Sequence, residues 1–313
     1  MRVICPGEML IDFVCLEAGK ELSQGETFVR KPGGAPANVA ACIARLGGEA
    51  SFVGALGSDG FGDYLFGQLE RYGVERCGVQ RVDKPTTMAF VSRREDGERE
   101  FQFNRGADAE LTLSQQQVED LLDNSILHLG AATAFLPGPL RQSYLQLARR
   151  ARQRQQIICF DPNYRQDLWS GNPKQFVKDC HSLLALANLV KVSEEELELL
   201  SGESDLEAAC QTLLQMGPEL ILVTRGSEGC LLCSAGQSQM IPASSVKVVD
   251  TTGAGDAFIG AFLYQVARLP EPGAYLEHAA AFTAFAIRVS GLVCTRLGAM
   301  TALPTLEEVS RRS

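Results

Sequence analysis

The most informative stretch of this chain is Val246-Lys247-Val248-Val249-Asp250-Thr251-Thr252-Gly253-Ala254-Gly255-Asp256. A β-branched run ends at an Asp-Thr-Thr turn, two glycines follow, and an apolar periodic segment begins at Ala257. This order predicts a strand over Val246–Val249, a tight turn and a helix. Glycines at a helix start let backbone N–H groups converge on an anion such as phosphate. The stretch therefore predicts an anion site between a strand and a helix.

Asp256 lies in the first turn of the predicted helix, beside the anion site. A carboxylate there would repel phosphate, and a role as the base for an attacking hydroxyl would explain it. The structural alternative is that Asp256 only stabilises the helix start and the glycines only turn the chain. A dinucleotide fingerprint fits poorly, because the third glycine falls at Gly260 and no acidic strand end follows. No Gly-x4-Gly-Lys-Ser/Thr motif occurs, which excludes a P-loop.

Composition narrows the functional class. The chain has 313 residues, of which 45% are hydrophobic, and a net charge of −9. This length is ample for a well-buried core, and the acidic balance does not favour nucleic acid or an anionic membrane surface as a partner. No run looks long and apolar enough to span a membrane, so no membrane segment is expected. Ten scattered cysteines suit free thiols in a reducing cytosol, so we expect a cytoplasmic protein.

Short apolar strands alternate with amphipathic helical segments along the chain. Besides the strand before Asp250, the predicted strands are Val3–Cys5, Ser51–Leu56, Ile126–Leu129, Ile157–Phe160, Leu189–Val192 and Leu220–Thr224. This alternation predicts an α/β fold, with a mostly parallel sheet covered by helices on both faces. Active sites of such sheets lie beyond the carboxyl ends of the strands.

Two segments break this alternation. The runs Thr87–Arg93 and Glu98–Phe103 alternate in polarity and flank Glu95-Asp96-Gly97, which predicts a β-hairpin. A segment at about 13–32 is also extended in character. Together with about 85–106 it would form a small sheet beside the main one, acting either as a lid or as a simple edge extension.

A second motif opens another helix. Gly33-Gly34-Ala35-Pro36-Ala37-Asn38-Val39-Ala40, with Gly47 and Gly57 downstream, resembles the N-terminal motif of the ribokinase-like (pfkB) carbohydrate kinases. Asp250–Phe258 resembles their C-terminal motif. Two motifs in the right order, far apart in one chain, are more specific than either alone. The resemblance covers essentially the whole chain and implies one ribokinase-like domain over residues 1–313, a three-layer α/β/α fold with a small β-sheet lid.

The resemblance also implies roles for individual residues. Asp256 would be the catalytic base, and the backbone N–H groups of Gly253, Ala254 and Gly255 would form an anion hole. The residues that would bind substrate are Asp12, Gly33, Gly34, Asn38, Phe103, Arg105 and Arg165. Those near the nucleotide would be Ser193, Thr224, Arg225, Gly226 and Gly229. A monovalent-cation site, for K⁺, would involve Asp250, Thr252, Val293, Arg296 and Gly298.

The implied cofactors are ATP and Mg²⁺. The family's Asn-x-x-Glu magnesium motif is replaced here by Ser193-Glu194-Glu195-Glu196. Glu196 would reach Mg²⁺ through water, although the run by itself also suits a solvated helix start.

The choice of sugar rests on other segments. Phe160–Arg165 and Phe103–Asp108 are similar to runs in fructokinases and 2-keto-3-deoxygluconate kinases, and of these we favour fructose as the phosphoryl acceptor. Aminoimidazole riboside, ribose and 2-keto-3-deoxygluconate kinases remain alternatives in the family. A catalytically silent sugar or nucleotide sensor is the alternative from another class. The lids of two subunits could also pair in a homodimer.

Overall fold

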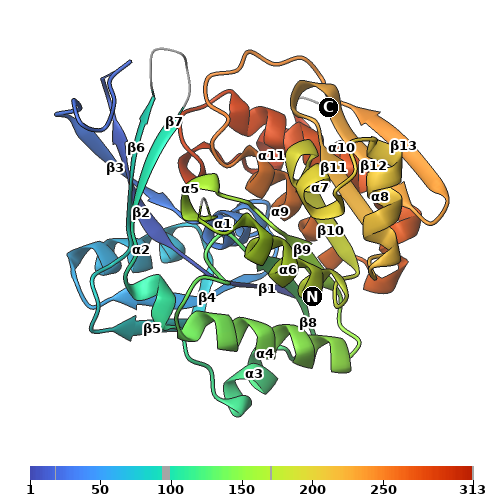
Figure 1. Cartoon of the computed structure of the whole chain (residues 1–313), viewed down its shortest axis with the longest axis horizontal. Coiled ribbons are helices and arrows are strands. Elements are labelled where there is room, and N and C mark those ends of the chain that lie inside the picture. The colour runs from blue at the N-terminus through green and yellow to red at the C-terminus, as the bar shows by residue number, and fades with distance from the viewer. Residues whose placement is uncertain (18, 94–98, 170, 312–313) are drawn as a thin grey trace.

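A computed structural model describes residues 1–17, 19–93, 99–169 and 171–311 (Figure 1). Among these residues the main sheet has nine strands in the order β13-β12-β11-β10-β9-β8-β1-β4-β5. Their bounds are β1 Arg2–Pro6, β4 Ala50–Gly57, β5 Glu75–Val82, β8 Ser125–Gly130, β9 Ile158–Asp161, β10 Leu189–Ser193, β11 Leu220–Thr224, β12 Gly229–Ser234 and β13 Gln237–Pro242. The strands from β11 to β5 pair in parallel, while β12 and β13 extend the sheet in antiparallel fashion.

Helices cover both faces of this sheet. Their bounds are α1 Ala35–Arg45, α2 Gly60–Arg71, α3 Gln115–Leu121, α4 Pro139–Gln153, α5 Gln166–Trp169, α6 Pro173–Leu184, α7 Glu194–Ser201, α8 Leu206–Gln215, α9 Ala254–Ala267, α10 Tyr275–Cys294 and α11 Leu306–Ser310. Val3 and Cys5 of β1 belong to the core shared with α1, α2, α9 and α10. Ile4 belongs to the core shared with α3, α4, α6, α7 and α8. Because side chains of a strand alternate in direction, one buried strand serves both cores. The predicted three-layer α/β/α fold is confirmed.

The predicted strand Val246–Val249 is wrong. This segment is not part of a sheet, and Val248 and Val249 are 58% and 45% exposed. A β-branched run favours extended backbone, but a strand also needs a neighbour to pair with. The edge position is occupied instead by the hairpin of β12 and β13, which we did not predict as a pair. The segment approaches α10 through a hydrogen bond from Val249 N to Cys294 O at 2.8 Å.

The expected second sheet is present. Its four described strands run in the order β3-β2-β6-β7, with bounds β2 Leu10–Cys15, β3 Phe28–Gly33, β6 Met88–Arg93 and β7 Arg99–Asn104. The predicted turn Glu95-Asp96-Gly97 lies outside the described residues. Phe13 and Phe90 stack with ring centroids 5.2 Å apart, and Phe61 of α2 meets Phe13 edge-on. In Figure 1 this small sheet (β3-β2-β6-β7) projects beside the main body, drawn in blue to cyan.

One expectation about the membrane also needs correction. The helical segment Pro272–Cys294 is long and apolar enough to cross a membrane, with a mean hydropathy of 1.2. Length and composition do not distinguish a membrane span from a core helix, and here α10 packs against α9, with Ala286 and Val289 fully buried. An amphipathic sequence pattern is absent where a helix is covered on several sides.

Candidate active site

The two motif helices lie in direct contact, so the residues at their N-termini come together. A Cβ on Gly260 of α9 would lie 2.9 Å from Cys42 Cβ and 3.1 Å from Val39 O of α1. Only a residue without a side chain permits this approach. Cys42 Sγ also contacts Ala257 O at 3.4 Å. The third glycine, which did not fit a dinucleotide fingerprint, therefore sets the spacing of α1 and α9.

Asn38 and Asp256 meet at this junction although they are 218 positions apart in sequence. Asn38 Nδ2 donates to Asp256 Oδ2 at 2.8 Å, and Asp256 is partly exposed. Desolvation raises the pKa of Asp256, while the hydrogen bond from Asn38 and the positive charges of Arg165 and Lys191 act in the opposite direction. A carboxylate in this setting is a stronger base than a solvated one.

The glycine turn before Asp256 has the form expected of an anion site. Gly253 is the N-cap of α9 with φ 75°, and no side chain caps this helix start. A Cβ on Gly253 would lie 2.5 Å from Ala299 Cβ, so the turn is packed closely from behind. Ala254 N donates to Thr251 O at 3.2 Å, whereas within the described residues no acceptor is shown for Gly253 N or Gly255 N. Uncapped N–H groups at the positive end of a helix attract anions.

The expected sugar-binding residues surround the start of α1. Gly34 caps α1 with φ 105°, and a Cβ there would lie 2.5 Å from Glu8 O. A Cβ on Gly33 would lie 2.0 Å from Asp12 Oδ2, so the Asp12 carboxylate lies directly against the Gly-Gly backbone. Asn38 is 6% exposed, and its Oδ1 has no hydrogen-bond partner among the described residues. Acceptors at this place suit a ligand rich in hydroxyl groups.

Glu8 holds this glycine segment in place, and we did not single it out from the sequence. Its Oε1 accepts from Ala35 N at 3.3 Å and its Oε2 from Thr133 Oγ1 at 3.1 Å. It is 3% exposed, and burial raises its pKa to about 7 against the effect of these hydrogen bonds. Gly34 offers no side chain, so a carboxylate from the end of β1 does the capping of α1. The short Gly-Glu sequence gives no signal of this.

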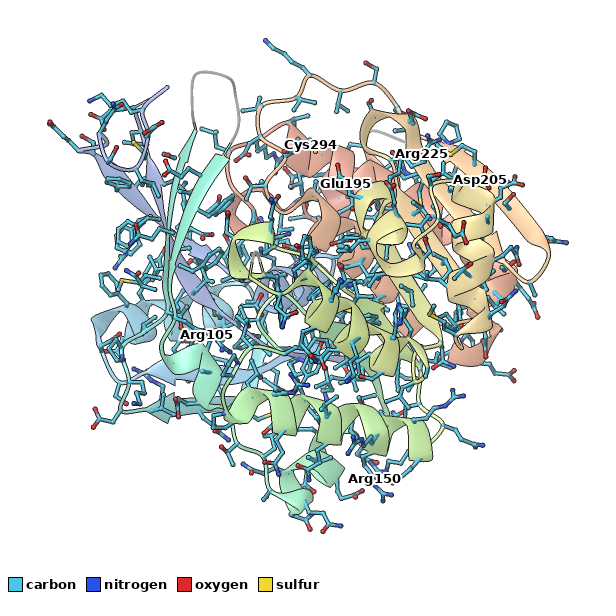
Figure 2. The ribbon with its side chains drawn as sticks, viewed as in Figure 1. Arg105, Arg150, Glu195, Asp205, Arg225 and Cys294 are labelled. Carbon is cyan, nitrogen blue, oxygen red and sulfur yellow. The ribbon has the colours of Figure 1, made fainter. Side chains whose placement is uncertain are left out.

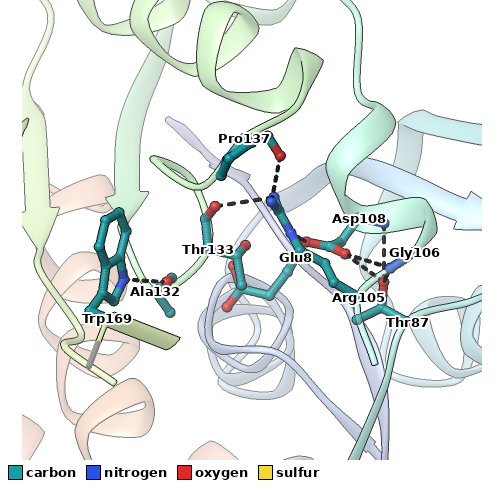
Figure 3. A network of polar contacts seen from close by, with 9 residues as sticks. All are labelled: Glu8, Thr87, Arg105, Gly106, Asp108, Ala132, Thr133, Pro137 and Trp169. Atoms are coloured by element: carbon teal, nitrogen blue, oxygen red, sulfur yellow. Dashed lines mark hydrogen bonds and ion pairs between the residues drawn. The ribbon is translucent and has the colours of Figure 1, made fainter. Parts of the chain in front are cut away.

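Arg105 is engaged in contacts within the protein. Figure 3 shows its guanidinium between the small sheet and the loop after β8. Nε pairs with Asp108 Oδ2 at 2.9 Å, Nη1 donates to Pro137 O at 2.6 Å, and Nη2 donates to Thr133 O at 3.2 Å. Thr87 Oγ1 donates to the same Asp108 carboxylate at 2.5 Å. In this conformation Arg105 ties the base of β6 and β7 to the main body.

The other two expected substrate residues are Arg165 and Phe103. Arg165 is exposed beyond the end of β9, with Nη1 donating to Tyr164 O at 3.1 Å. Its positive charge lowers the pKa of Asp256. Phe103 is partly buried on β7 and stacks on Phe101 with centroids 6.1 Å apart.

The expected nucleotide residues lie at the ends of β10 and β11, and Figure 2 shows one of them, Arg225, on the opposite side of the view from Arg105. Ser193 caps α7 in a capping box with Glu196, and Thr224 Oγ1 donates to Val192 O at 3.2 Å. Arg225 Nε pairs with Glu194 Oε1 at 2.8 Å. The two glycines that follow Arg225 have positive φ; these are Gly226 at 54° and Gly229 at 113°. The parallel strands thus bring these sequence-distant residues to one edge of the sheet.

A buried ion pair lies between these two groups of residues. Lys191 of β10 is 7% exposed and its Nζ lies 3.1 Å from Asp161 Oδ2 of β9. Burial raises the pKa of Asp161, and Lys191 opposes that shift. Burial lowers the pKa of Lys191. The negative charges of Asp161, Glu196 and Asp256 outweigh this effect and raise the pKa above its ordinary value, so the ammonium stays charged. We did not assign Lys191 a role from the sequence.

Glu196 is the candidate carboxylate for Mg²⁺. It is 8% exposed, and it accepts from Ser193 N at 2.9 Å and from Tyr164 N at 2.7 Å. Within the described residues, no three His, Cys, Asp or Glu side chains are grouped as a metal cage. Mg²⁺ prefers carboxylate oxygens and commonly binds through one or two of them, with substrate phosphates and waters. The donor chemistry therefore fits.

The expected monovalent-cation residues are also brought together. Asp250 Oδ1 accepts from Thr252 N at 3.0 Å and Thr252 Oγ1 at 2.7 Å, and Oδ2 accepts from Gly298 N at 2.8 Å. Arg296 N donates to Val293 O at 3.0 Å, within the same loop. The Arg296 side chain pairs with Glu308, so only its backbone faces the loop. The Asp250 turn is thus hydrogen-bonded to the 293–298 loop through Gly298.

Comparisons with known proteins agree with this geometry. Residues 1–306 match the profile of the pfkB family carbohydrate kinases. The chain is 39% identical to fructokinase-1 of Oryza sativa subsp. japonica over 98% of this chain and 96% of that protein. The ATP-bound fructokinase of Xylella fastidiosa superposes with a TM-score of 0.87 at 34% identity, covering 99% of this chain and 97% of its own.

A second solved structure is a double mutant of the fructokinase of Vibrio cholerae O395 with bound fructose, ADP and potassium. It has a TM-score of 0.84 at 29% identity, and the match covers 99% of this chain and 97% of that one. Full-length similarity in sequence and structure, together with both motifs at one site, shows that this chain belongs to the pfkB family of carbohydrate kinases.

Proposed function

We propose that this kinase transfers the γ-phosphoryl group of ATP to D-fructose, giving D-fructose 6-phosphate and ADP. The observation that carries the proposal is the hydrogen bond between Asn38 and Asp256, the proposed sugar-binding residue and the proposed base, at an uncapped helix N-terminus. The relatives named as fructokinases, which match nearly the full chain, support fructose as the acceptor.

In this mechanism Asp256 takes the proton of the attacking hydroxyl as its oxygen bonds to phosphorus. The proton goes to a carboxylate oxygen, and the bond between the γ-phosphorus and its bridging oxygen breaks to release ADP. The N–H groups of Gly253 and Gly255 would stabilise the negative charge of the transferred group. Asp12 and Asn38 would hold the sugar, so that the acceptor oxygen lies in line with phosphorus. Mg²⁺ near Glu196 would supply charge neutralisation on the nucleotide phosphates.

The small sheet would act as the lid over the sugar. Arg105 would anchor its base, while Phe103 and Arg165 would approach the substrate when the site closes and water is excluded. The nucleotide would lie along the loops that follow β10 and β11. We also propose a cytosolic location, since all ten cysteines are free thiols. Pairing of two lids in a homodimer remains a prediction.

A sugar panel tests the proposal. Phosphorylation of fructose, ribose, 2-keto-3-deoxygluconate, adenosine and aminoimidazole riboside would be followed by ADP release at fixed ATP and Mg²⁺. We expect the highest kcat/KM for fructose. A clear preference for another acceptor would replace fructose while leaving the kinase assignment intact. Binding of sugar and ATP without ADP release for every acceptor would favour a silent sensor.

A further inference from the structure

The buried ion pair between Lys191 and Asp161 lies directly behind the anion site. A Cβ on Gly255 would lie 3.1 Å from Lys191 Nζ and 3.6 Å from its Cε, so the ammonium packs against the first turn of α9. Gly255 is therefore the residue that leaves room for this cation. The Lys191 and Asp161 side chains are 9% and 2% exposed.

This placement of a cation is unfavourable by itself. The N-terminus of a helix carries partial positive charge, which disfavours a lysine there. Burying two charges also costs more than an exposed pair, and apolar residues of similar volume commonly replace such pairs without loss of stability. Packing therefore does not explain Lys191, and buried charges held against a cost are characteristic of functional sites.

The charges around Lys191 indicate what it does. It stands among three carboxylates, Asp161, Glu196 and Asp256, and it is the buried cation of this group. The group therefore has a net negative charge at the place where the proposed reaction transfers an anionic phosphoryl group. A fixed cation reduces the repulsion between these carboxylates and the phosphoryl group.

We propose that Lys191 is a positioning residue for phosphoryl transfer, whose ammonium supplies a fixed positive charge behind the Gly253–Gly255 turn. The inference rests on the proposed kinase function. Lys191 acts through the turn and through Asp256, and Asp161 fixes the direction of its side chain. Its effect is greatest when charge develops on the transferred group, so kcat depends on it more than the KM for sugar does.

The test compares Lys191→Met with the double variant Lys191→Met/Asp161→Asn. The single variant leaves Asp161 buried without its partner and risks unfolding. The double variant removes both charges and restores neutrality. Arg141→Met is the matched control, because Arg141 forms an ion pair with the buried Asp179 at 2.6 Å on α4 and α6, outside the site. Thermal unfolding verifies that each variant is folded.

We expect the double variant to be folded. Its kcat should fall by roughly 10- to 100-fold, which is at most the fall in kcat caused by removing one direct anion-hole donor. The fructose KM should change by less than about threefold, as expected for an interaction made mainly in the transition state. Arg141→Met should retain wild-type kcat.

The pH profile gives a second readout. Because Lys191 lowers the pKa of Asp256, Lys191→Met should move the acidic limb of kcat/KM to higher pH, and the shift should be smaller in the double variant, which also loses the opposing charge of Asp161. The polar and charged groups that face Asp256 are Asn38 of α1, Cys42 of α1, Asp161 of β9, Arg165 after β9, Lys191 of β10 and Glu196 of α7. All except Lys191 and Asp161 are unchanged in the double variant.

The outcomes distinguish a role of Lys191 in phosphoryl transfer from a purely structural role. Wild-type kcat in the double variant would show that Lys191 only neutralises Asp161. A double variant that does not fold would show that the pair serves the fold. Either result overturns the inference. Wild-type protein inactive on every sugar would reject the proposed function, and this inference with it.

Discussion

Replacing Asp256 with Asn is the most direct perturbation of the site. Asn keeps the shape of Asp, and its Oδ1 can still accept the hydrogen bond that Asn38 Nδ2 now gives to Asp256 at 2.8 Å. The exchange removes the property that the proposed mechanism needs from Asp256, a basic carboxylate. We therefore expect the fold and the sugar site to persist while the rate of phosphoryl transfer falls.

The magnitude follows from the role of a general base. Such groups contribute roughly 100- to 10,000-fold, so kcat should fall by about 100-fold or more, or about 2.7 kcal/mol in activation free energy at the lower limit. Fructose KM should change little, because Asn38 and Asp12 remain. Loss of a transition-state interaction lowers kcat and kcat/KM together.

We expect Asp256→Asn to be more stable than wild type, although its kcat is lower. Desolvation raises the pKa of Asp256 in the folded protein above its unfolded value. A group shifted upward contributes stability below its unfolded pKa and loses that contribution as pH rises through the folded pKa. At neutral pH the ionised side chain is therefore a liability, and Asp256→Asn should unfold at a higher temperature than wild type.

The assay couples ADP release to fructose phosphorylation, with thermal unfolding measured on the same preparations at pH 7. Contamination of the variant by wild-type enzyme is assessed with mixtures that contain known amounts of wild type. A variant with near wild-type kcat would refute Asp256 as the base. A variant that is both slow and less stable would instead indicate that the carboxylate holds the turn together.

Three further predictions address the surroundings of the base. If a K⁺ ion bound by the Asp250 turn and the 293–298 loop aligns the anion hole, kcat in K⁺ should exceed kcat in Na⁺ or tetramethylammonium at equal ionic strength; equal rates would mean that the hydrogen bonds of Asp250 to Thr252 and Gly298 suffice. Gly34→Ala should lose roughly 1–3 kcal/mol in unfolding free energy, seen in urea titration, because φ is 105° and its Cβ would meet Glu8 O at 2.5 Å; unchanged stability would show that the backbone relaxes there. Burial raises the pKa of Glu8 in the folded protein to about 7, so its stabilising contribution is present at pH 4.5 and lost as pH rises through 7. Glu8→Gln should therefore flatten the pH dependence of the unfolding free energy between these two pH values. An unchanged slope would contradict the raised pKa of Glu8.

The sequence by itself determined the fold class and most elements of the main sheet. Buried parallel strands read as short apolar runs, as at β4, where every residue is buried. The Gly-rich starts of α1 and α9 were also visible, because glycine at a helix start has a local steric meaning. Local pattern failed at Val246–Val249, where β-branched residues indicated a strand without showing whether a partner strand was available. It failed again at α10, whose apolar surface fits both a core and a membrane.

Only the tertiary structure decided how the site is assembled. The hydrogen bond from Asn38 to Asp256 joins residues 218 positions apart, and it depends on the close approach of α1 and α9 at Gly260. The capping of α1 by Glu8, the anchoring of β7 by Arg105 and the position of Lys191 behind Gly255 are likewise contacts between elements distant in sequence. Spacing along a chain encodes which face of one element a residue occupies, whereas packing of several elements decides which charges meet and how deeply they are buried.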